Sequence, residues 1–153
     1  MDPIYTAYLE GELKLDKHGK WFHNGAPFQN NNLIELFNRS ITWDDSQNKY
    51  FLNIGKGRAS FLVEDTAYFV LELLDEEVPC QVRLSDRSQE ELILNQIEIG
   101  AENQIYCYVK NGHRARFSRS AHQALLKHAS GPREIKLNGT VFPLIPILIT
   151  SNL

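Results

Sequence analysis

The stretch KWFHNGAPF, residues 20–28, decides how the first half of the chain folds. Bulky residues precede Asn24-Gly25, and an apolar stretch follows it. Asn-Gly favours positive φ at both central positions of a tight turn, which suits the reversal of one strand into the next. The stretch therefore predicts a β-hairpin.

A short amphipathic helix is predicted directly after this hairpin, over residues 31–38, with an asparagine as its cap. Apolar residues recur there at helical spacing: Leu33, Ile34, Leu36 and Phe37. Strand-like runs rich in β-branched and aromatic residues then follow at 40–43, 49–54, 59–63, 67–74, 78–84 and 92–99.

The second half of the chain repeats this order. Residues 108–112, YVKNG, correspond to residues 21–25, WFHNG, at an offset of 87. A helix near 120–130 is predicted next, with Ser120 as its N-cap and Gly131-Pro132 at its end. Two strands follow at 133–137 and 140–149, joined by a third Asn-Gly.

We therefore predict an α+β fold that is mainly β. It comprises two β-rich units with a repeated strand-turn-strand-helix-strand motif, each with one short helix. The units are expected at residues 1–100 and 101–153, within one globule of 153 residues. A degenerate duplication would explain the repeat, although Asn-Gly turns are also common in unrelated hairpins.

Charge is distributed unevenly along the chain. Residues 1–63 carry seven acids and seven bases, residues 64–102 carry eleven acids and two bases, and residues 103–153 carry one acid and seven bases, giving 0, −9 and +6. Opposite segments can screen one another, or the basic one can face an anionic ligand. The net charge of −3 argues against nucleic acid as a partner.

The composition predicts a cytoplasmic protein that is not anchored in a membrane. No apolar run reaches the roughly 20 residues of a membrane helix. The first residues lack the positive start and apolar stretch of a secretory signal. Cys80 and Cys107 lie among apolar neighbours, which favours buried free thiols over a disulfide or a reactive thiol.

We find no catalytic, metal or cofactor signature. No two of the five histidines have the i, i+4 spacing of helical metal ligands, and no Gly-x-Ser-x-Gly motif occurs. Lys56-Gly57-Arg58 lacks the complete frame of a phosphate loop, so a plain turn is the better interpretation. No catalytic residues, metal ligands or cofactors are therefore assigned.

One charged constellation nevertheless stands out. Lys56 and Arg58 precede the apolar run 61–63, and Glu64-Asp65 follow it. Ion pairs between these groups would clamp the end of a strand. Alternatively, the same charges would form the mouth of a pocket for a charged ligand or a side chain of a partner.

The chain resembles the DUF1285 family of uncharacterised bacterial proteins. The resemblance rests on residues 19–28 and 33–37, on Gly57-Arg58 through Val63-Glu64-Asp65, and on residues 139–144. It implies a mainly β fold with repeated motifs and a role in signal transduction, and it supplies no catalytic residues. The matching positions that could face a ligand are Trp21, His23, Arg58, Glu64 and Asp65.

Two functional hypotheses follow. The first is a non-enzymatic ligand- or protein-binding module, with candidate residues Trp21, His23, Lys56, Arg58, Glu64 and Asp65. The second is a small hydrolase or transferase that uses Glu64 or Asp65 with His23 and Arg58. The partner is an unknown small ligand or protein, and a homodimer stays open as a third alternative.

Overall fold

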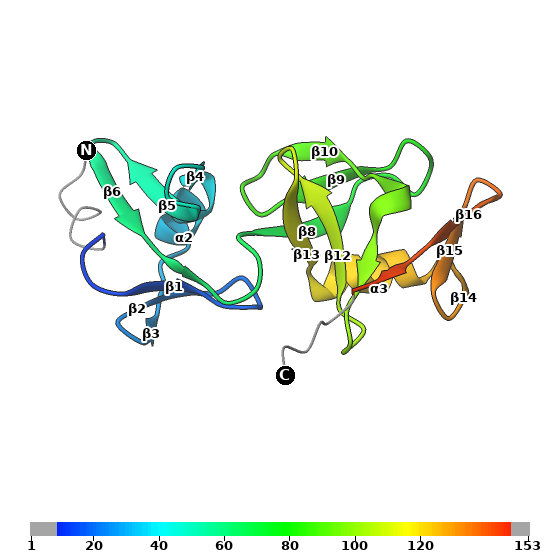
Figure 1. Ribbon diagram of the computed structural model, residues 1–153, viewed down its shortest axis with the longest axis horizontal. Coiled ribbons are helices and arrows are strands. Elements are labelled where there is room, and N and C mark those ends of the chain that lie inside the picture. Colours follow the sequence, from blue (N-terminus) through cyan, green and yellow to red (C-terminus); the bar gives the residue numbers. More distant parts are fainter. Residues whose placement is uncertain (1–8, 148–153) are drawn as a thin grey trace. The chain divides into compact units, whose positions relative to one another are not determined.

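The structure is a computed structural model that describes residues 9–147, and it divides into two compact units (Figure 1). Unit 1 takes the described residues up to Tyr68, together with Ser85–Arg87. Unit 2 takes Phe69–Leu84 and the described residues from Ser88 onward. The predicted mainly β fold with two short helices is confirmed.

Among the described residues, unit 1 contains two small sheets and one helix. The first sheet has the strand order β3-β2-β1-β7, with β1 antiparallel to β2 and parallel to β7. The second is the antiparallel meander β4-β5-β6. The element bounds are β1 Leu13–Leu15, β2 Trp21–His23, β3 Ala26–Pro27, α2 Asn31–Arg39, β4 Ile41–Asp44, β5 Lys49–Ile54, β6 Gly57–Ser60 and β7 Leu62–Val63.

The local sequence explains the first hairpin and the helix that follows it. Asn24 and Gly25 have φ of 49° and 84°, as the predicted Asn-Gly turn requires. Asn30 caps α2, since its Oδ1 accepts hydrogen bonds from the backbone N–H groups of Asn32 and Leu33 at 3.0 and 3.2 Å. The helix then buries Leu33 and Phe37 in the core of unit 1.

Up to residue 147, where the described range ends, unit 2 contains one large sheet, one meander and one α-helix. The large sheet has the order β10-β9-β8-β13-β12-β11-β17, and the meander is β14-β15-β16. The bounds are β8 Tyr68–Leu73, β9 Gln81–Leu84, β10 Gln89–Glu91, the 3-10 helix η1 Leu94–Gln96, β11 Glu98–Ile99, β12 Ile105–Val109, β13 His113–Phe117, α3 Arg119–Leu126, β14 Ala129–Gly131, β15 Glu134–Leu137, β16 Thr140–Pro143 and β17 Ile145–Pro146.

The two units repeat one topology, which confirms the motif predicted from the sequence. In each unit a strand pairs antiparallel with the next, a hairpin leads to a short helix, a three-stranded meander follows, and a last strand returns parallel to the first. Strands β1 to β7 with α2 therefore correspond to β11 to β17 with α3.

Matching hydrogen bonds fix the register of this repeat. The backbone N–H of Asp16 donates to the Lys20 carbonyl at 2.9 Å in unit 1, and that of Gly100 donates to the Gln104 carbonyl at 2.8 Å in unit 2. This equivalence pairs Trp21 with Ile105, not with Tyr108. The sequence offset of 87 was wrong for these strands because β12 is longer than β2 and displaces its turn.

A second pair of hydrogen bonds fixes the register of the meanders. The backbone N–H of Asn53 donates to the Ser40 carbonyl at 3.0 Å, and that of Lys136 donates to the His128 carbonyl at 2.8 Å. Leu52, one residue before Asn53, therefore corresponds to Ile135, and both side chains are fully buried.

The boundary between the units lies at Tyr68 and Phe69, not at residue 100 as the sequence predicted. Strands β8 and β9 precede residue 100 but join the large sheet of unit 2, in which β8 lies beside β13. This pairing joins segments that are distant in sequence. Local sequence pattern carries no signal for such a contact.

Several predicted elements differ in the structure, among them the strand predicted at 59–63, which divides into β6 and β7. Residues 92–99 form η1 and the short β11 instead of one strand, because Leu94 and Ile97 are both buried at a spacing of three. The second helix spans Arg119–Leu126 instead of 120–130, since residues 129–131 pair with β15 as β14. The predicted strand 140–149 divides into β16 and β17, and its residues 148–149 lie outside the described range.

The cap of the second helix also differs from the prediction. Ser118, not Ser120, is the N-cap of α3, and its Oγ accepts a hydrogen bond from the Ala121 backbone N–H at 3.3 Å. The Ser120 hydroxyl instead donates to the Leu71 carbonyl at 3.3 Å. Gly131 ends no helix, because it belongs to β14.

Both cysteines are free and buried, as predicted. Burial, followed by the charges of Asp75 and Glu76, raises the pKa of the Cys80 thiol to about 11. Burial and the nearby Glu90 raise the pKa of the Cys107 thiol to about 12. Both groups are therefore protonated at neutral pH.

We expect neither thiol to react with Ellman's reagent in the native protein at pH 8, because the nucleophilic thiolate is scarce and the sulfur is enclosed. Both should react at once in denaturant. Rapid native modification at either cysteine, located by mass spectrometry, would contradict this account.

Neither described α-helix is long and apolar enough to cross a membrane.

Candidate functional site

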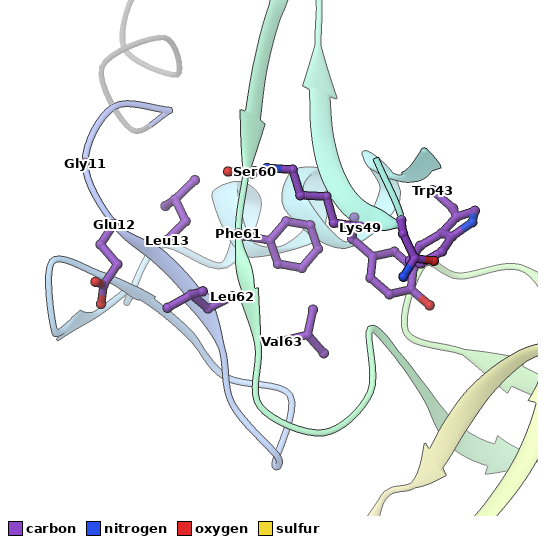
Figure 2. Close-up of a pocket in the computed structure, with 11 residues that line it drawn as sticks. Gly11, Glu12, Leu13, Trp43, Lys49, Ser60, Phe61, Leu62 and Val63 are labelled. Atoms are coloured by element: carbon purple, nitrogen blue, oxygen red, sulfur yellow. The ribbon is translucent and has the colours of Figure 1, made fainter. Parts of the chain in front are cut away.

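A pocket of about 530 Å³ opens in unit 1, where residues 60–63 run between the start of β1 and the β4–β5 hairpin (Figure 2). Three segments distant in sequence supply its walls. They contribute Gly11, Glu12, Leu13, Trp43, Asn48, Lys49, Tyr50, Ser60, Phe61, Leu62 and Val63. A volume of this size matches the range of about 300–1,000 Å³ seen for small-molecule sites.

Aromatic rings form one wall of the pocket. Trp43 and Tyr50 are directly paired across β4 and β5, with ring centroids 4.7 Å apart and planes at 63°. The Tyr50 ring lies 6.3 Å from that of Phe61. The Trp43 indole N–H donates to the Asp45 Oδ1 at 2.6 Å, which fixes the orientation of the indole. Partial burial raises the pKa of the Tyr50 phenol, so this hydroxyl is neutral at physiological pH.

Two opposite charges stand at the pocket. Glu12 is exposed, and its backbone N–H donates to the Asn24 Oδ1 at 2.8 Å, so the turn between β2 and β3 holds this segment in place. Lys49 is exposed at the start of β5, with its Nζ 5.2 Å from the centroid of the Phe51 ring. Both side chains are therefore accessible to a ligand.

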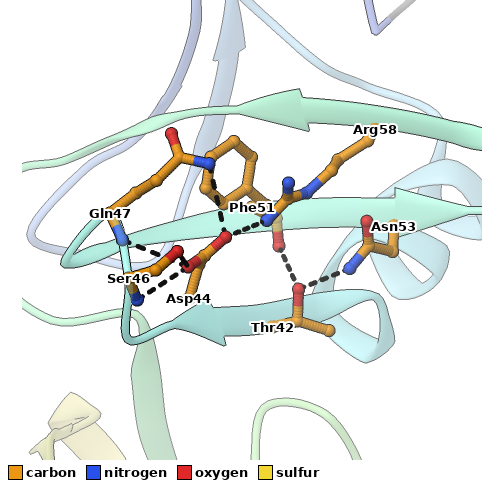
Figure 3. Close-up of polar contacts among 7 residues, drawn as sticks. All are labelled: Thr42, Asp44, Ser46, Gln47, Phe51, Asn53 and Arg58. Atoms are coloured by element: carbon orange, nitrogen blue, oxygen red, sulfur yellow. Dashed lines mark hydrogen bonds and ion pairs between the residues drawn. The ribbon is translucent and has the colours of Figure 1, made fainter.

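Asp44 organises the turn beside this pocket (Figure 3). Its Oδ1 accepts hydrogen bonds from the Ser46 hydroxyl at 2.6 Å and from the Gln47 backbone N–H at 3.1 Å. Its Oδ2 pairs with the Arg58 guanidinium at 2.6 Å. The Arg58 guanidinium carbon lies 3.7 Å from the centroid of the Phe51 ring, so it stacks on β5 as well. The Ser46 hydroxyl, followed by Arg58, holds the pKa of the Asp44 carboxyl well below its usual range.

This depressed pKa predicts how stability depends on pH. A carboxyl with a lower pKa in the folded state stabilises the fold above its unfolded pKa, near 4, and loses this contribution as pH falls toward the folded pKa. Asp44→Asn should therefore destabilise the protein at pH 7, and the difference from wild type should shrink below about pH 4. Chemical denaturation at both pH values measures it. A difference that stays constant down to pH 2.5 would contradict the assignment.

The structure places the first two predicted site residues in different surroundings. Trp21 is only 1% exposed, and it packs between Phe37 and Phe61 with centroid distances of 5.4 and 4.8 Å. Its indole N–H donates to the Asn38 Oδ1 at 2.8 Å. Trp21 is thus a core residue that offers a ligand no surface. His23 is partly exposed, and its Nε2 lies 2.6 Å from the Glu10 carbonyl oxygen.

The charged constellation pairs differently from either sequence interpretation. Arg58 forms its ion pair with Asp44, whereas Glu64 lies 3.8 Å from the Lys14 Nζ and accepts a hydrogen bond from the Lys17 backbone N–H at 2.9 Å. Lys56 is exposed in the turn between β5 and β6. Asp65 is partly buried. None of the six predicted residues is among those that line the pocket of unit 1.

The residues that the sequence reasoning missed are mainly Trp43, Tyr50, Lys49 and Glu12. One available signal was overlooked. Trp43 and Tyr50 lie on either side of the polar residues 44–48, which separate the predicted strands 40–43 and 49–54, and residues on either side of a hairpin turn become cross-strand neighbours. Glu12 gave no comparable signal, because it reaches the pocket only through tertiary contacts.

Unit 2 has a pocket of its own, of about 470 Å³, lined by Glu90, Ile93, Gln96, Tyr108, Val109, Asn111 and Gly112. It contains one aromatic residue, Tyr108, whose hydroxyl donates to the Glu98 Oε1 at 3.0 Å. This pocket lacks the aromatic wall of unit 1. In residues 9–147, no three His, Cys, Asp or Glu side chains gather closely enough to hold a metal ion.

Comparisons with known proteins identify the fold. No family model and no curated protein matches the chain. A crystal structure of a DUF1285 family protein from Silicibacter pomeroyi DSS-3 aligns with a TM-score of 0.65 at 14% identity, over 89% of this chain and 80% of that one. A DUF1285 family protein from Shewanella baltica OS155 aligns with a TM-score of 0.58 at 15% identity, over 78% of this chain and 93% of that one. The chain therefore has the fold of DUF1285 family proteins, which confirms at the level of the fold the resemblance seen in its sequence.

Proposed function

We propose that this chain is a non-enzymatic binding module, and that unit 1 takes a small ligand in the pocket beside Trp43 and Tyr50. One observation carries the proposal. The same meander occurs twice within residues 9–147, and the copy in unit 1 places the paired rings of Trp43 and Tyr50, together with the charged Lys49, at a pocket of about 530 Å³.

Comparison of the two units distinguishes side chains that the fold requires from side chains that it does not require. Buried positions of the meander are apolar in both units: Leu52 corresponds to Ile135, Ile54 to Leu137, and Phe61 to Leu144. The residue types at the pocket positions differ between the two units. Counted along the chain at the same offset, the positions of Tyr50 and Lys49 fall on Arg133 and Pro132, which form the turn between β14 and β15. Since unit 2 builds its meander without these side chains, the fold does not account for their presence in unit 1.

The contacts of the other predicted residues favour binding over the hydrolase or transferase alternative. That alternative requires His23 and Arg58 to act with Glu64 or Asp65. Two of these groups have other partners, since Arg58 pairs with Asp44 and Glu64 pairs with Lys14. A cytoplasmic location, which the composition predicts, and a role in signal transduction, which the family resemblance implies, extend the proposal: the module would sense a small molecule.

A thermal-shift screen of metabolites tests the proposal with matched variants. Tyr50→Ala removes the aromatic wall, and Arg133→Ala changes the corresponding position of unit 2. A ligand at about 100 times its Kd stabilises a protein by about 2.7 kcal/mol. We expect such a ligand to raise the Tm of wild type and of Arg133→Ala, and to have little effect on Tyr50→Ala.

Leu62→Arg provides a second variant that should not disturb folding, because the Leu62 side chain is 57% exposed at the pocket. It should weaken binding by obstructing the pocket. A ligand that stabilises both pocket variants as much as wild type would contradict the proposal, as would a broad panel in which no compound stabilises the wild type.

A further inference from the structure

We infer that the pocket of unit 1 recognises a zwitterion with an apolar body, such as an apolar amino acid or a short apolar peptide with both ends free. The ligand carboxylate would face Lys49, its ammonium would face Glu12, and its apolar part would lie against the aromatic wall. The inference rests on the proposed function, because it names the class of ligand for that pocket.

The placement of the two charges is the first support. Glu12 and Lys49 lie on opposite sides of residues 60–63, so a ligand that crosses this segment would meet one charge at each end (Figure 2). Within residues 9–147, neither the Glu12 carboxylate nor the Lys49 ammonium forms an ion pair. Each charge is thus available to a group of opposite sign.

The surface between the charges is the second support. Phe61, Leu62 and Val63 lie between Glu12 and Lys49, and the rings of Trp43 and Tyr50 continue this apolar surface. A ligand that consisted of charge alone would gain nothing from these side chains, whereas an aliphatic or aromatic body would be removed from water. The pocket therefore suits a molecule with an apolar centre and charged ends.

The repeat supplies the third support. The register of β1 and β11 equates Glu12 with Gln96, and the same count along β5 and β15 places Pro132, a turn residue, at the position of Lys49. Unit 2 therefore carries neither charge, although its equivalent of Leu13 is the buried Ile97. Both charges accompany the aromatic wall in unit 1, and both are missing where that wall is missing. Because the two charges and the aromatic wall occur together, we infer a single ligand that contacts Glu12, Lys49 and the aromatic wall.

Four versions of one dipeptide test the inference by calorimetry with the full chain. The probes are Leu-Phe, acetyl-Leu-Phe, Leu-Phe amide and acetyl-Leu-Phe amide, which differ only in their end charges. Since exposed ion pairs are weak, we expect each missing charge to weaken binding roughly two- to fivefold. Free Leu-Phe should bind tightest and the doubly capped form weakest. Free leucine and phenylalanine, run alongside, distinguish an amino-acid ligand from a peptide.

Variants of Lys49 and Glu12 test which residue binds which end of the dipeptide. Lys49→Met should abolish the preference for a free carboxylate, and Glu12→Gln the preference for a free ammonium. Lys56→Met is the matched control, because this exposed cation of unit 1 lies outside the pocket lining, and it should change neither preference.

The outcomes separate this inference from the proposed function. If all four dipeptides bound equally well and this binding were lost in Leu62→Arg, the inference of a zwitterionic ligand would be overturned. The proposal that the pocket binds a ligand would stand. The zwitterion would also be overturned, and the pocket kept, if no dipeptide or free amino acid bound while another compound stabilised the wild type but not Tyr50→Ala. Binding that survives in Leu62→Arg would contradict both.

Discussion

Trp21→Ala is expected to lower the free energy of unfolding by about 3–5 kcal/mol, as is typical when a buried aromatic residue is truncated. The side chain is 1% exposed and packs between Phe37 and Phe61. Its loss also removes the hydrogen bond from the indole to Asn38. Since the whole stability of a domain is about 5–15 kcal/mol, the variant should be close to unfolding. Urea denaturation followed by circular dichroism measures the change.

Trp43→Ala is the matched control, because the chain has two tryptophans and only Trp43 lines the pocket. Its side chain is partly exposed, so the loss of stability should be clearly smaller than for Trp21→Ala. The loss of ligand binding should show the reverse order, because Trp43→Ala changes the pocket and Trp21→Ala does not. A stable Trp21→Ala protein that had lost binding would restore Trp21 as the site residue that the sequence predicted.

The second large effect concerns the repeat. Leu52→Ala and Ile135→Ala are each expected to cost about 2–5 kcal/mol, because each truncates a side chain with no exposed surface. The two residues hold the same position in their meanders, where Leu52 lies opposite Ile41 and Ile135 lies opposite Ala129. Thermal unfolding of both variants gives the comparison.

Leu62→Ala and Ile145→Ala serve as controls at another pair of equivalent positions. These side chains are 57% and 40% exposed, so their truncation should cost much less than that of Leu52 or Ile135. If Leu52→Ala and Ile135→Ala were as harmless as the controls, the burial that the structure gives to both positions would be contradicted.

The local parts of this fold are readable from the sequence because local chemistry determines them. The Asn24-Gly25 turn, the cap that Asn30 provides and the apolar face of α2 depend on residues a few positions apart. The same holds for the hairpin around Asn138-Gly139, whose φ values of 51° and 77° fit its turn. The repeat was recognisable because these local signals recur in the same order.

Long-range pairing is what the sequence could not supply. The unit boundary was misplaced because β8 pairs with β13, and no local pattern specifies that partner. The second helix was extended too far because Gly131-Pro132 resembles a helix end, although the preceding residues had already entered a strand.

The surroundings of the predicted site residues differ from those expected for a related reason. Lys56, Arg58, Glu64 and Asp65 are close in sequence, yet Arg58 and Glu64 find their ionic partners in other segments. Trp21 resembled a ligand-facing residue because its motif is distinctive, but tertiary packing buries it. Proximity in sequence is a poor guide to a pocket whose walls come from three separate segments.

The most direct test of the central claim, that the unit 1 pocket binds a ligand, is a fragment screen by ¹H–¹⁵N correlation spectroscopy. The two tryptophans give two indole N–H signals, one from the core and one from the pocket. We predict that fragments which bind will move the Trp43 indole signal and the backbone signals of residues 60–63, and will leave the Trp21 indole signal in place. Fragments that bind while the Trp43 signal stays unchanged, with shifts confined to unit 2, would contradict the account.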